Sequence, residues 1–158
     1  MAPREVCCCL ALPIAVYCIT RGCGVVLVLL DLPDQLYEAG RNPQQLVVLD
    51  SDSGKVLQSF PISAGVDAAA FEPETGLIFV STREGMVHVF HEDSPDKFSE
   101  AETVKTEFGA KTMGLDTKTR NIFLSTVDFG PAPAPTTDHS HPNPTPIPGT
   151  FHVLVYGK

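Results

Sequence analysis

The segment that decides the fold is Phe71-Glu-Pro-Glu-Thr-Gly-Leu-Ile-Phe-Val-Ser-Thr82, because it recurs as Leu115-Asp-Thr-Lys-Thr-Arg-Asn-Ile-Phe-Leu-Ser-Thr126. The two copies align without a gap, and five positions are identical: Thr75/Thr119, Ile78/Ile122, Phe79/Phe123, Ser81/Ser125 and Thr82/Thr126. A repeat with a period of about 40–50 residues and strand-like content is typical of β-propeller blades. The sequence therefore predicts an all-β fold built from four-stranded antiparallel blades.

Further strand-like runs, separated by Gly, Pro, Asp and Asn, extend the repeat in both directions. They predict about three blades, over residues 25–62, 67–105 and 111–156. The expected strands are 25–30, 35–39, 45–50 and 55–62, then 67–71, 77–82, 86–91 and 100–105, then 111–115, 121–126 and 151–156. Closed propellers usually have about four to eight blades. We therefore expect a partial β-propeller whose last blade is one strand short.

Composition excludes several classes of function. The chain has 158 residues and a formal net charge of −8. This length suits one domain, and the acidic balance disfavours nucleic-acid binding, which needs clustered Lys and Arg. No phosphate-binding loop, dinucleotide fingerprint or Gly-x-Ser-x-Gly elbow is present. We predict no catalytic residue and no cofactor.

Residues 1–24 differ sharply in composition from the rest. Arg4 precedes an apolar run from Val6 to Ile19, which favours a signal-like leader and hence a periplasmic or secreted protein. The run is too short for a stable membrane span. Two other interpretations stay open: a strand around residues 14–20, and a segment foreign to the domain. In addition, a strand from the leader would supply the missing fourth strand of the last blade. All five cysteines lie in this region, without the paired spacing of a zinc site: Cys7, Cys8, Cys9, Cys18 and Cys23.

A proline-rich stretch, residues 128–149, interrupts the third blade. Alternating prolines favour extended backbone and supply no ladder donors, so we expect a long exposed loop. At its centre, Asp138, His139 and His141 are weak candidates for binding Zn²⁺ or Cu²⁺. The favoured interpretation of these residues is a polar loop tip.

The candidate binding face comprises the loops that join strand four to the next strand one and strand two to strand three. Mixed charges there suit a small polar or anionic ligand, or a protein partner. The alternative interpretation is ordinary solvated turn residues. The candidates are Arg41, Asn42, Asp67, Arg83, Lys111 and Asp128.

Other residues have a structural interpretation. We expect His88 to be a satisfied histidine on an apolar strand, and Asp93 and Asp96 to fix the turn around Ser94-Pro95. Five phenylalanines on strands are expected in the core: Phe60, Phe71, Phe79, Phe90 and Phe123.

Two motifs carry a family resemblance. Ser53-Gly54-Lys55-Val56 corresponds to a Thr-Gly-Lys-Val motif, and Ile78-Phe79-Val80-Ser81 corresponds to Tyr-Val-Thr-Asn. Over roughly residues 34–158 the chain resembles the YVTN-repeat propellers of the YncE-like family, distant from the WD40 and quinoprotein-dehydrogenase propellers. The family is typically about twice as long, so the chain is similar to its C-terminal part.

The repeats, together with the absence of a catalytic constellation, favour a non-catalytic YVTN-type repeat protein that binds a ligand or a protein partner on its loop face. The alternative is a metal-dependent hydrolase like the lactonases of related propellers, with Asp67 and Asp128 in suitable loops. An unclosed stack of blades leaves apolar faces without neighbours. Two outcomes follow from this: two copies associate to complete a six-bladed ring, or the chain is a truncated product of marginal stability.

Overall fold

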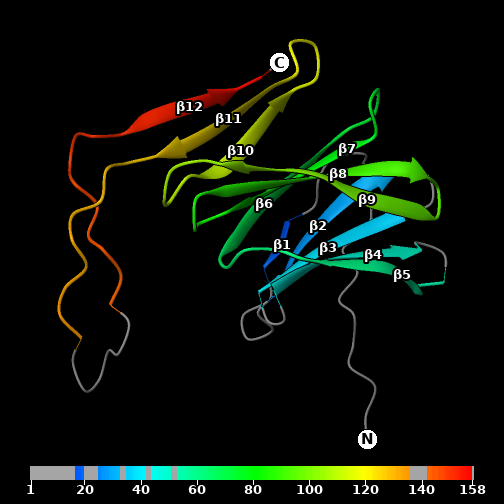
Figure 1. Ribbon diagram of the computed structural model, residues 1–158, viewed down its shortest axis with the longest axis horizontal. Helices are drawn as coiled ribbons and strands as arrows, with labels where there is room; N and C mark the ends of the chain where they lie inside the picture. The colour runs from blue at the N-terminus through cyan, green and yellow to red at the C-terminus, as the bar shows by residue number, and fades with distance from the viewer. Residues whose placement is uncertain are drawn as a thin grey trace, which may run out of the picture.

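The computed structural model describes residues 17–19, 25–32, 35–41, 44–50, 53–135 and 142–157, with side chains described at Ala39 and from Gln44 onwards. All regular structure in these ranges is β-strand, and every pairing between strands is antiparallel (Figure 1). The prediction of an all-β fold of antiparallel sheets is confirmed. No described segment is a helix able to cross a membrane.

The strands form three sheets, and neighbours in each sheet follow chain order. The first sheet contains β1 (Tyr17–Ile19), β2 (Val25–Leu32), β3 (Gln35–Arg41), β4 (Gln44–Asp50) and β5 (Val56–Pro61). The middle sheet contains β6 (Val66–Glu72), β7 (Leu77–Thr82), β8 (Met86–Ser94) and β9 (Lys97–Lys105). The third sheet contains β10 (Lys111–Asp116), β11 (Asn121–Thr126) and β12 (His152–Tyr156). Each strand expected after residue 24 is present.

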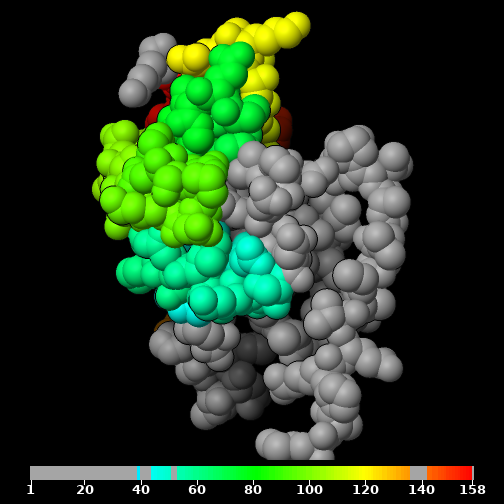
Figure 2. All heavy atoms as spheres, turned by 90° about the vertical axis from the view of Figure 1, so that its right-hand side faces the viewer, coloured from blue at the N-terminus to red at the C-terminus, as the bar shows by residue number. Residues whose placement is uncertain are grey.

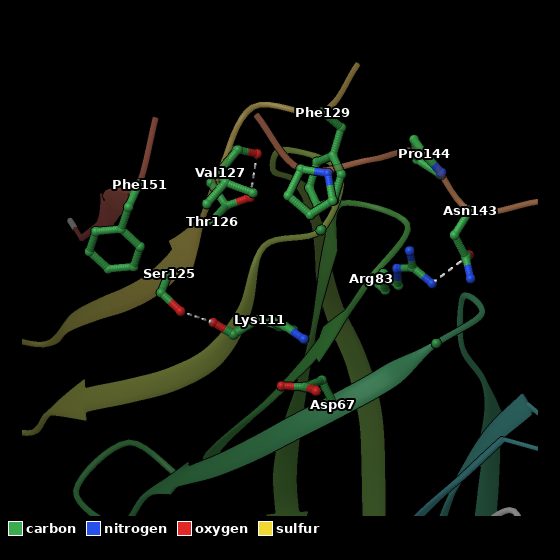
Figure 3. A pocket seen from close by; sticks show the side chains of 13 residues that line it. Asp67, Arg83, Lys111, Ser125, Thr126, Val127, Phe129, Asn143, Pro144 and Phe151 are labelled. Atoms are coloured by element: carbon green, nitrogen blue, oxygen red, sulfur yellow. Dashed lines mark hydrogen bonds between the residues drawn. The ribbon is translucent and has the colours of Figure 1, made fainter. Parts of the chain in front are cut away.

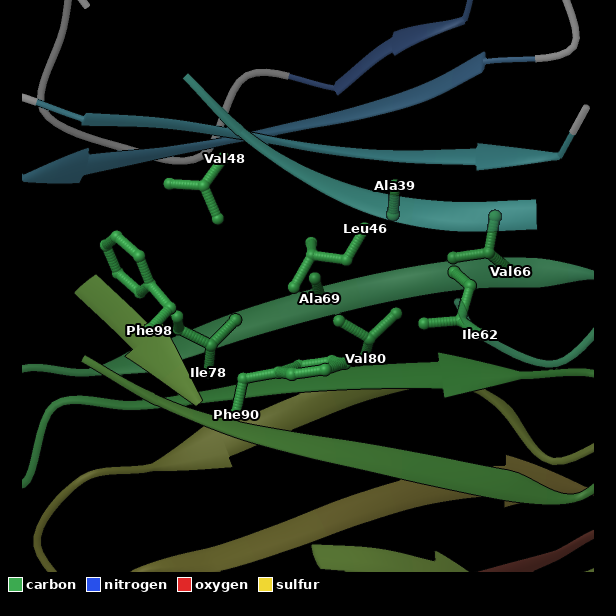
Figure 4. Close-up of a cluster of buried hydrophobic side chains, with 10 residues drawn as sticks. All are labelled: Ala39, Leu46, Val48, Ile62, Val66, Ala69, Ile78, Val80, Phe90 and Phe98. Atoms are coloured by element: carbon green, nitrogen blue, oxygen red, sulfur yellow. The ribbon is translucent and has the colours of Figure 1, made fainter. Parts of the chain in front are cut away.

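The three sheets stack face to face, with the middle sheet covered on both sides. Figure 2 shows the layers in chain order, from cyan through green to yellow. Ile78, Val80 and Phe90 of the middle sheet pack on Leu46 and Val48 of the first sheet (Figure 4). On the opposite face, Val87 and Val89 pack in one cluster with apolar side chains of the third sheet, among them Ile122 and Leu124. Alternation along β8 thus supplies two cores at once.

The sheets also approach one another strand by strand. The first strands of successive sheets are in contact, β2 with β6 and β6 with β10. The last strands β5 and β9 are in contact as well. Equivalent strands therefore lie opposite one another, which is the arrangement that a repeating sequence unit produces.

Thr75 and Thr119, which occupy the same position in the two copies of the repeat, have the same role in the turn between the first two strands of their sheets. Glu72 accepts hydrogen bonds from the Glu74 N–H at 3.0 Å and from the Thr75 hydroxyl. Asp116 accepts from the Lys118 N–H at 3.0 Å and from the Thr119 hydroxyl at 2.8 Å. In both copies the hydroxyl bond is the main cause of a lowered carboxyl pKa. An acidic residue followed three positions later by Thr thus fixes the same turn twice.

The N-terminal strand differs from one of our expectations. Tyr17–Ile19 forms β1 and pairs antiparallel with β2, so it extends the first sheet instead of completing the last. Pairing with a strand close in sequence closes a short loop, which costs less entropy than pairing with β12. The rest of the expected leader, with Cys7, Cys8, Cys9 and Cys23, lies outside the described residues.

The expected break between the strands 86–91 and 100–105 is shorter than predicted. β8 continues to Ser94 and β9 begins at Lys97, so only Pro95 and Asp96 form the turn. Asp93 does not fix this turn through the backbone; its carboxylate accepts from the Ser99 hydroxyl at 3.0 Å and contacts His91 Nδ1 at 2.8 Å. The bond to Ser99 joins β8 to β9 near the turn, where the hairpin extends beyond the region that local sequence indicated.

Four of the five expected core phenylalanines are in the core, and the fifth is not. Phe90 is fully buried, and Phe60, Phe71 and Phe79 pack against the two apolar clusters. Phe123 is 37% exposed because it lies on the face of the third sheet that no described residue covers.

His88 is a satisfied histidine, as expected. Its Nε2 accepts the Ser63 N–H at 2.9 Å, and its Nδ1 lies 3.3 Å from the Thr103 hydroxyl. The ring stacks beside Phe90 with centroids 6.3 Å apart. Burial lowers the pKa of His88, and the nearby charge of Glu100 opposes this only in part.

We predict that Ile78→Ala lowers the free energy of unfolding by about 2–5 kcal/mol, because it leaves a cavity between the first two sheets. The matched control is Val56→Ala, at a side chain that is 54% exposed, which should change stability by roughly 0.5 kcal/mol or less. Urea unfolding measures both. Equal losses would contradict the described core.

We predict that His88 makes stability depend on pH. Folding lowers the pKa of His88 below its ordinary value of 6.5, so the folded protein binds fewer protons than the unfolded one. The contribution of His88 to the free energy of unfolding is therefore present above pH 6.5 and is lost as the pH falls. His152 has the opposite sign, since bonds to Thr150 and Glu107 raise its pKa, and its contribution is lost as pH rises. Between pH 7.5 and pH 5, the free energy of unfolding should fall less in His88→Gln than in the wild type. It should fall more in His152→Gln than in the wild type. The same pH difference in all three proteins would refute this.

Candidate functional site

A cavity of about 700 Å³ lies at one end of the middle and third sheets (Figure 3). It occurs where β6 and β10 begin and β7 and β11 end. This is the loop face that the sequence indicated. Its lining includes Gly65, Asp67, Arg83, Lys111, Phe129 and Asn143.

Three of the six predicted binding residues lie together on this cavity: Asp67, Arg83 and Lys111. Asp128 does not line it, although its neighbours Val127 and Phe129 do. Arg41 ends β3 and pairs in register with Gln44 in the first sheet, and its side chain is not described. Asn42 and the metal candidates Asp138, His139 and His141 lie outside the described residues.

Both the side chain and the backbone of Arg83 are fixed by contacts. Its guanidinium donates to Asn143 Oδ1 at 2.9 Å and lies 5.4 Å from the centre of the Phe108 ring, within cation–π range. Its backbone N–H donates to Gly65 at 2.9 Å, and its carbonyl accepts the Gly109 N–H at 2.7 Å. The guanidinium therefore has a fixed orientation at the edge of the cavity.

Gly65 is required for this placement. Its φ is +75°, and a Cβ there would lie 2.8 Å from the Cβ of Arg83. Only a residue without a side chain lets the start of β6 approach the end of β7 so closely. The close contact sets where Arg83 leaves the sheet.

An aromatic wall faces the charged groups. The rings of Phe108 and Phe129 meet edge to face, with centroids 5.1 Å apart. The Phe129 ring lies directly over Gly109, so closely that a Cβ at Gly109 would be 2.3 Å from it. The wall depends on that glycine.

The proline-rich insertion supplies Phe129 of this wall, and backbone hydrogen bonds join its two arms at the base. Phe129 and Pro146 form an antiparallel bridge, closed by the Gly130 N–H on Thr145 at 2.9 Å and the Ile147 N–H on Asp128 at 2.8 Å. The described parts of the insertion are mostly exposed and lie outside any strand, as expected for a long loop, and the single bridge forms because both donors are non-proline residues beside the prolines. The two arms thereby bring Phe129 and Asn143 over the cavity.

Sequence reasoning missed Phe129, Asn143 and Phe108. The signal that was available is an aromatic residue in a polar insertion, Asp128-Phe-Gly-Pro, next to a predicted binding loop. Asn143 offered no local signal, because its contact with Arg83 spans 60 positions.

The charges of the described site favour an anion. Arg83 and Lys111 bring two positive charges against one carboxylate, that of Asp67. One oxygen of Asp67 is already engaged, since it accepts the Thr112 N–H at 2.8 Å and so holds Thr112 at a positive φ of 56°. A lining with a net positive charge stands out in a chain whose net charge is −8.

Metal ligands do not gather in the described part of the chain. No three His, Cys, Asp or Glu side chains there lie close enough together to hold a metal ion. One carboxylate oxygen of Asp67, one of the two acids considered for a hydrolase, accepts the Thr112 N–H.

A second cavity, of about 730 Å³, opens between the middle and third sheets. Val104 of β9 and Tyr156 of β12 are among the residues that line it. β9 is the fourth strand of its sheet, and the third sheet has no fourth strand among the described residues. The cavity therefore lies between the two sheets, next to β9 and the C-terminal end of β12.

No protein-family model matches the chain, and a search of curated proteins finds no significant match.

We predict that Gly109→Ala displaces Phe129 and costs more than its matched control, Gly54→Ala. Both glycines have positive φ, so both variants carry a backbone strain of about 1–2 kcal/mol, but nothing lies within 4 Å of a Cβ at Gly54. Unfolding free energies and the NMR signals of the Phe129 ring measure the difference. Equal costs with an unmoved ring would contradict the described wall.

Proposed function

We propose that this chain is a non-catalytic β-propeller repeat protein, of the YVTN-repeat type that it resembles, and that it binds a small anionic ligand in the cavity on its loop face. The propeller assignment draws support from the repeat, from the stacking of antiparallel sheets and from the contacts between equivalent strands. The binding assignment rests on one observation, the convergence of Arg83 and Lys111 on one cavity beside Phe129.

Each group has a separate part in recognition. The guanidinium of Arg83 is planar and held in place by Asn143, which suits a carboxylate or a phosphate. Lys111 adds a second, more mobile point charge. The cavity has the size of ordinary small-molecule sites, which span about 300–1,000 Å³.

The apolar part of the lining indicates the rest of the ligand. Phe129 and Phe151 both face the cavity, together with Pro144 and Pro146 of the insertion. Phe151 is 68% exposed, so an apolar ligand group would remove it from water. The ligand class that fits is a small carboxylate or phosphate ester with an aromatic or aliphatic body.

The test is an NMR titration of the full chain with benzoate and, separately, with inorganic phosphate. We expect benzoate to shift the amide signals around Lys111, Ser125 and Val127, and to bind more weakly as salt increases. Arg83→Gln should weaken binding about tenfold or more, because a charge-assisted hydrogen bond contributes about 1.5–3 kcal/mol.

The matched control is Lys118→Gln, which removes the same charge from the exposed β10–β11 turn, away from the cavity. It should leave the affinity within about twofold of the wild type. Equal losses in the two variants would mean that net charge alone drives binding, and absence of benzoate shifts would overturn the ligand assignment.

A further inference from the structure

The outer face of the third sheet, formed by Phe123, Val153 and Val155, is apolar and exposed. The three side chains are 37%, 49% and 57% exposed. Phe123 and Val155 are directly paired in the register of β11 and β12, and Val153 lies two positions along the same strand. They therefore form one continuous apolar surface.

The middle sheet contains the same surface, and there it is covered. Phe79 pairs with Val89 as Phe123 pairs with Val155, and Ser81 pairs with Val87 as Ser125 pairs with Val153. Yet Val87 and Val89 are only 3% and 7% exposed. The side chains of the third sheet that share their cluster include Ile122, Leu124 and Leu154. The exposed outer face of the third sheet therefore has the same residue pattern as the face of the middle sheet that the third sheet covers.

The inner face of the third sheet, which covers the middle sheet, has an equivalent on the far face of the first sheet. Leu49 pairs with Leu36 in the first sheet as Phe90 pairs with Ile78 in the middle sheet and as Tyr156 pairs with Ile122 in the third. Val47 and Leu49 are half-buried and alternate with Leu46 and Val48, which face the middle sheet. The far face of the first sheet is therefore the same kind of face as the one by which the third sheet covers the middle sheet.

We propose that a second copy of this chain covers the outer face of the third sheet with the far face of its own first sheet, head to tail. Because each copy carries one face of each type, two such contacts close the pair by a two-fold rotation. Three sheets from each copy make six, and two is the only number of copies that falls within the usual range of about four to eight blades. The inference rests on the proposed propeller architecture, but not on the ligand.

The test is the mass of the full chain in solution, by sedimentation velocity from about 1 to 100 µM. We expect a species of twice the 17.0 kDa chain mass. Val155→Lys should shift it to monomer, with at least a tenfold rise in the dissociation constant, because an ammonium would be buried among apolar groups. Thr117→Lys places the same charge on the exposed turn between β10 and β11, outside both proposed contact faces, and should leave the dimer intact.

A second variant tests the direction of assembly. Leu49→Lys should also give monomers in the head-to-tail arrangement, whereas it leaves intact a dimer in which two outer faces pack on each other. Cross-linking mass spectrometry of the wild type gives the same information if this variant does not fold, since cross-links should join the surroundings of β12 to those of β4 in the partner.

Three results would overturn the proposal: a wild-type monomer at 100 µM, a dimer that Val155→Lys does not weaken, or open polymers larger than a dimer. A monomer that still binds benzoate through Arg83 would reject the assembly and leave the binding function standing. A dimer that binds no anion would do the reverse.

Discussion

The structure depends on a middle sheet that is buried on both faces. β8 shows this most clearly, because Phe90 points into the cluster shared with the first sheet while Val87 and Val89 point into the cluster shared with the third. Burial of apolar area is the dominant favourable term in folding, and one strand here contributes to two cores. Loss of either neighbouring sheet would expose one side of this strand, so the three sheets are coupled energetically.

The position of the candidate site follows from this stacking. Because equivalent strands lie opposite one another, the start of β6 and the start of β10 come together at one end, with the ends of β7 and β11. Asp67, Arg83 and Lys111 belong to different strands or turns, and the stack brings them to one cavity. The insertion then adds Phe129 and Asn143, which convert a set of loop ends into a walled site.

Much of the fold could be predicted from the sequence, because alternation and turn residues are local signals. The repeat located β7 and β11 to the residue, and the acid-x-x-Thr turn explains why Thr75 and Thr119 are identical. The features that sequence reasoning missed depend on distant contacts. Asn143 reaches Arg83 only because the insertion folds back, and the exposure of Phe123 depends on which sheet covers it rather than on its own strand.

The central claim is that the middle sheet is the doubly buried layer of a three-sheet stack. The most direct test is native-state amide hydrogen exchange, followed residue by residue by NMR. The account predicts that amides of β7 and of the β7–β8 pairing exchange only through global unfolding, with the largest protection in the chain. Amides of β12 should open at a lower free energy. Fast exchange in β7, or equal protection in β7 and β12, would contradict the stack.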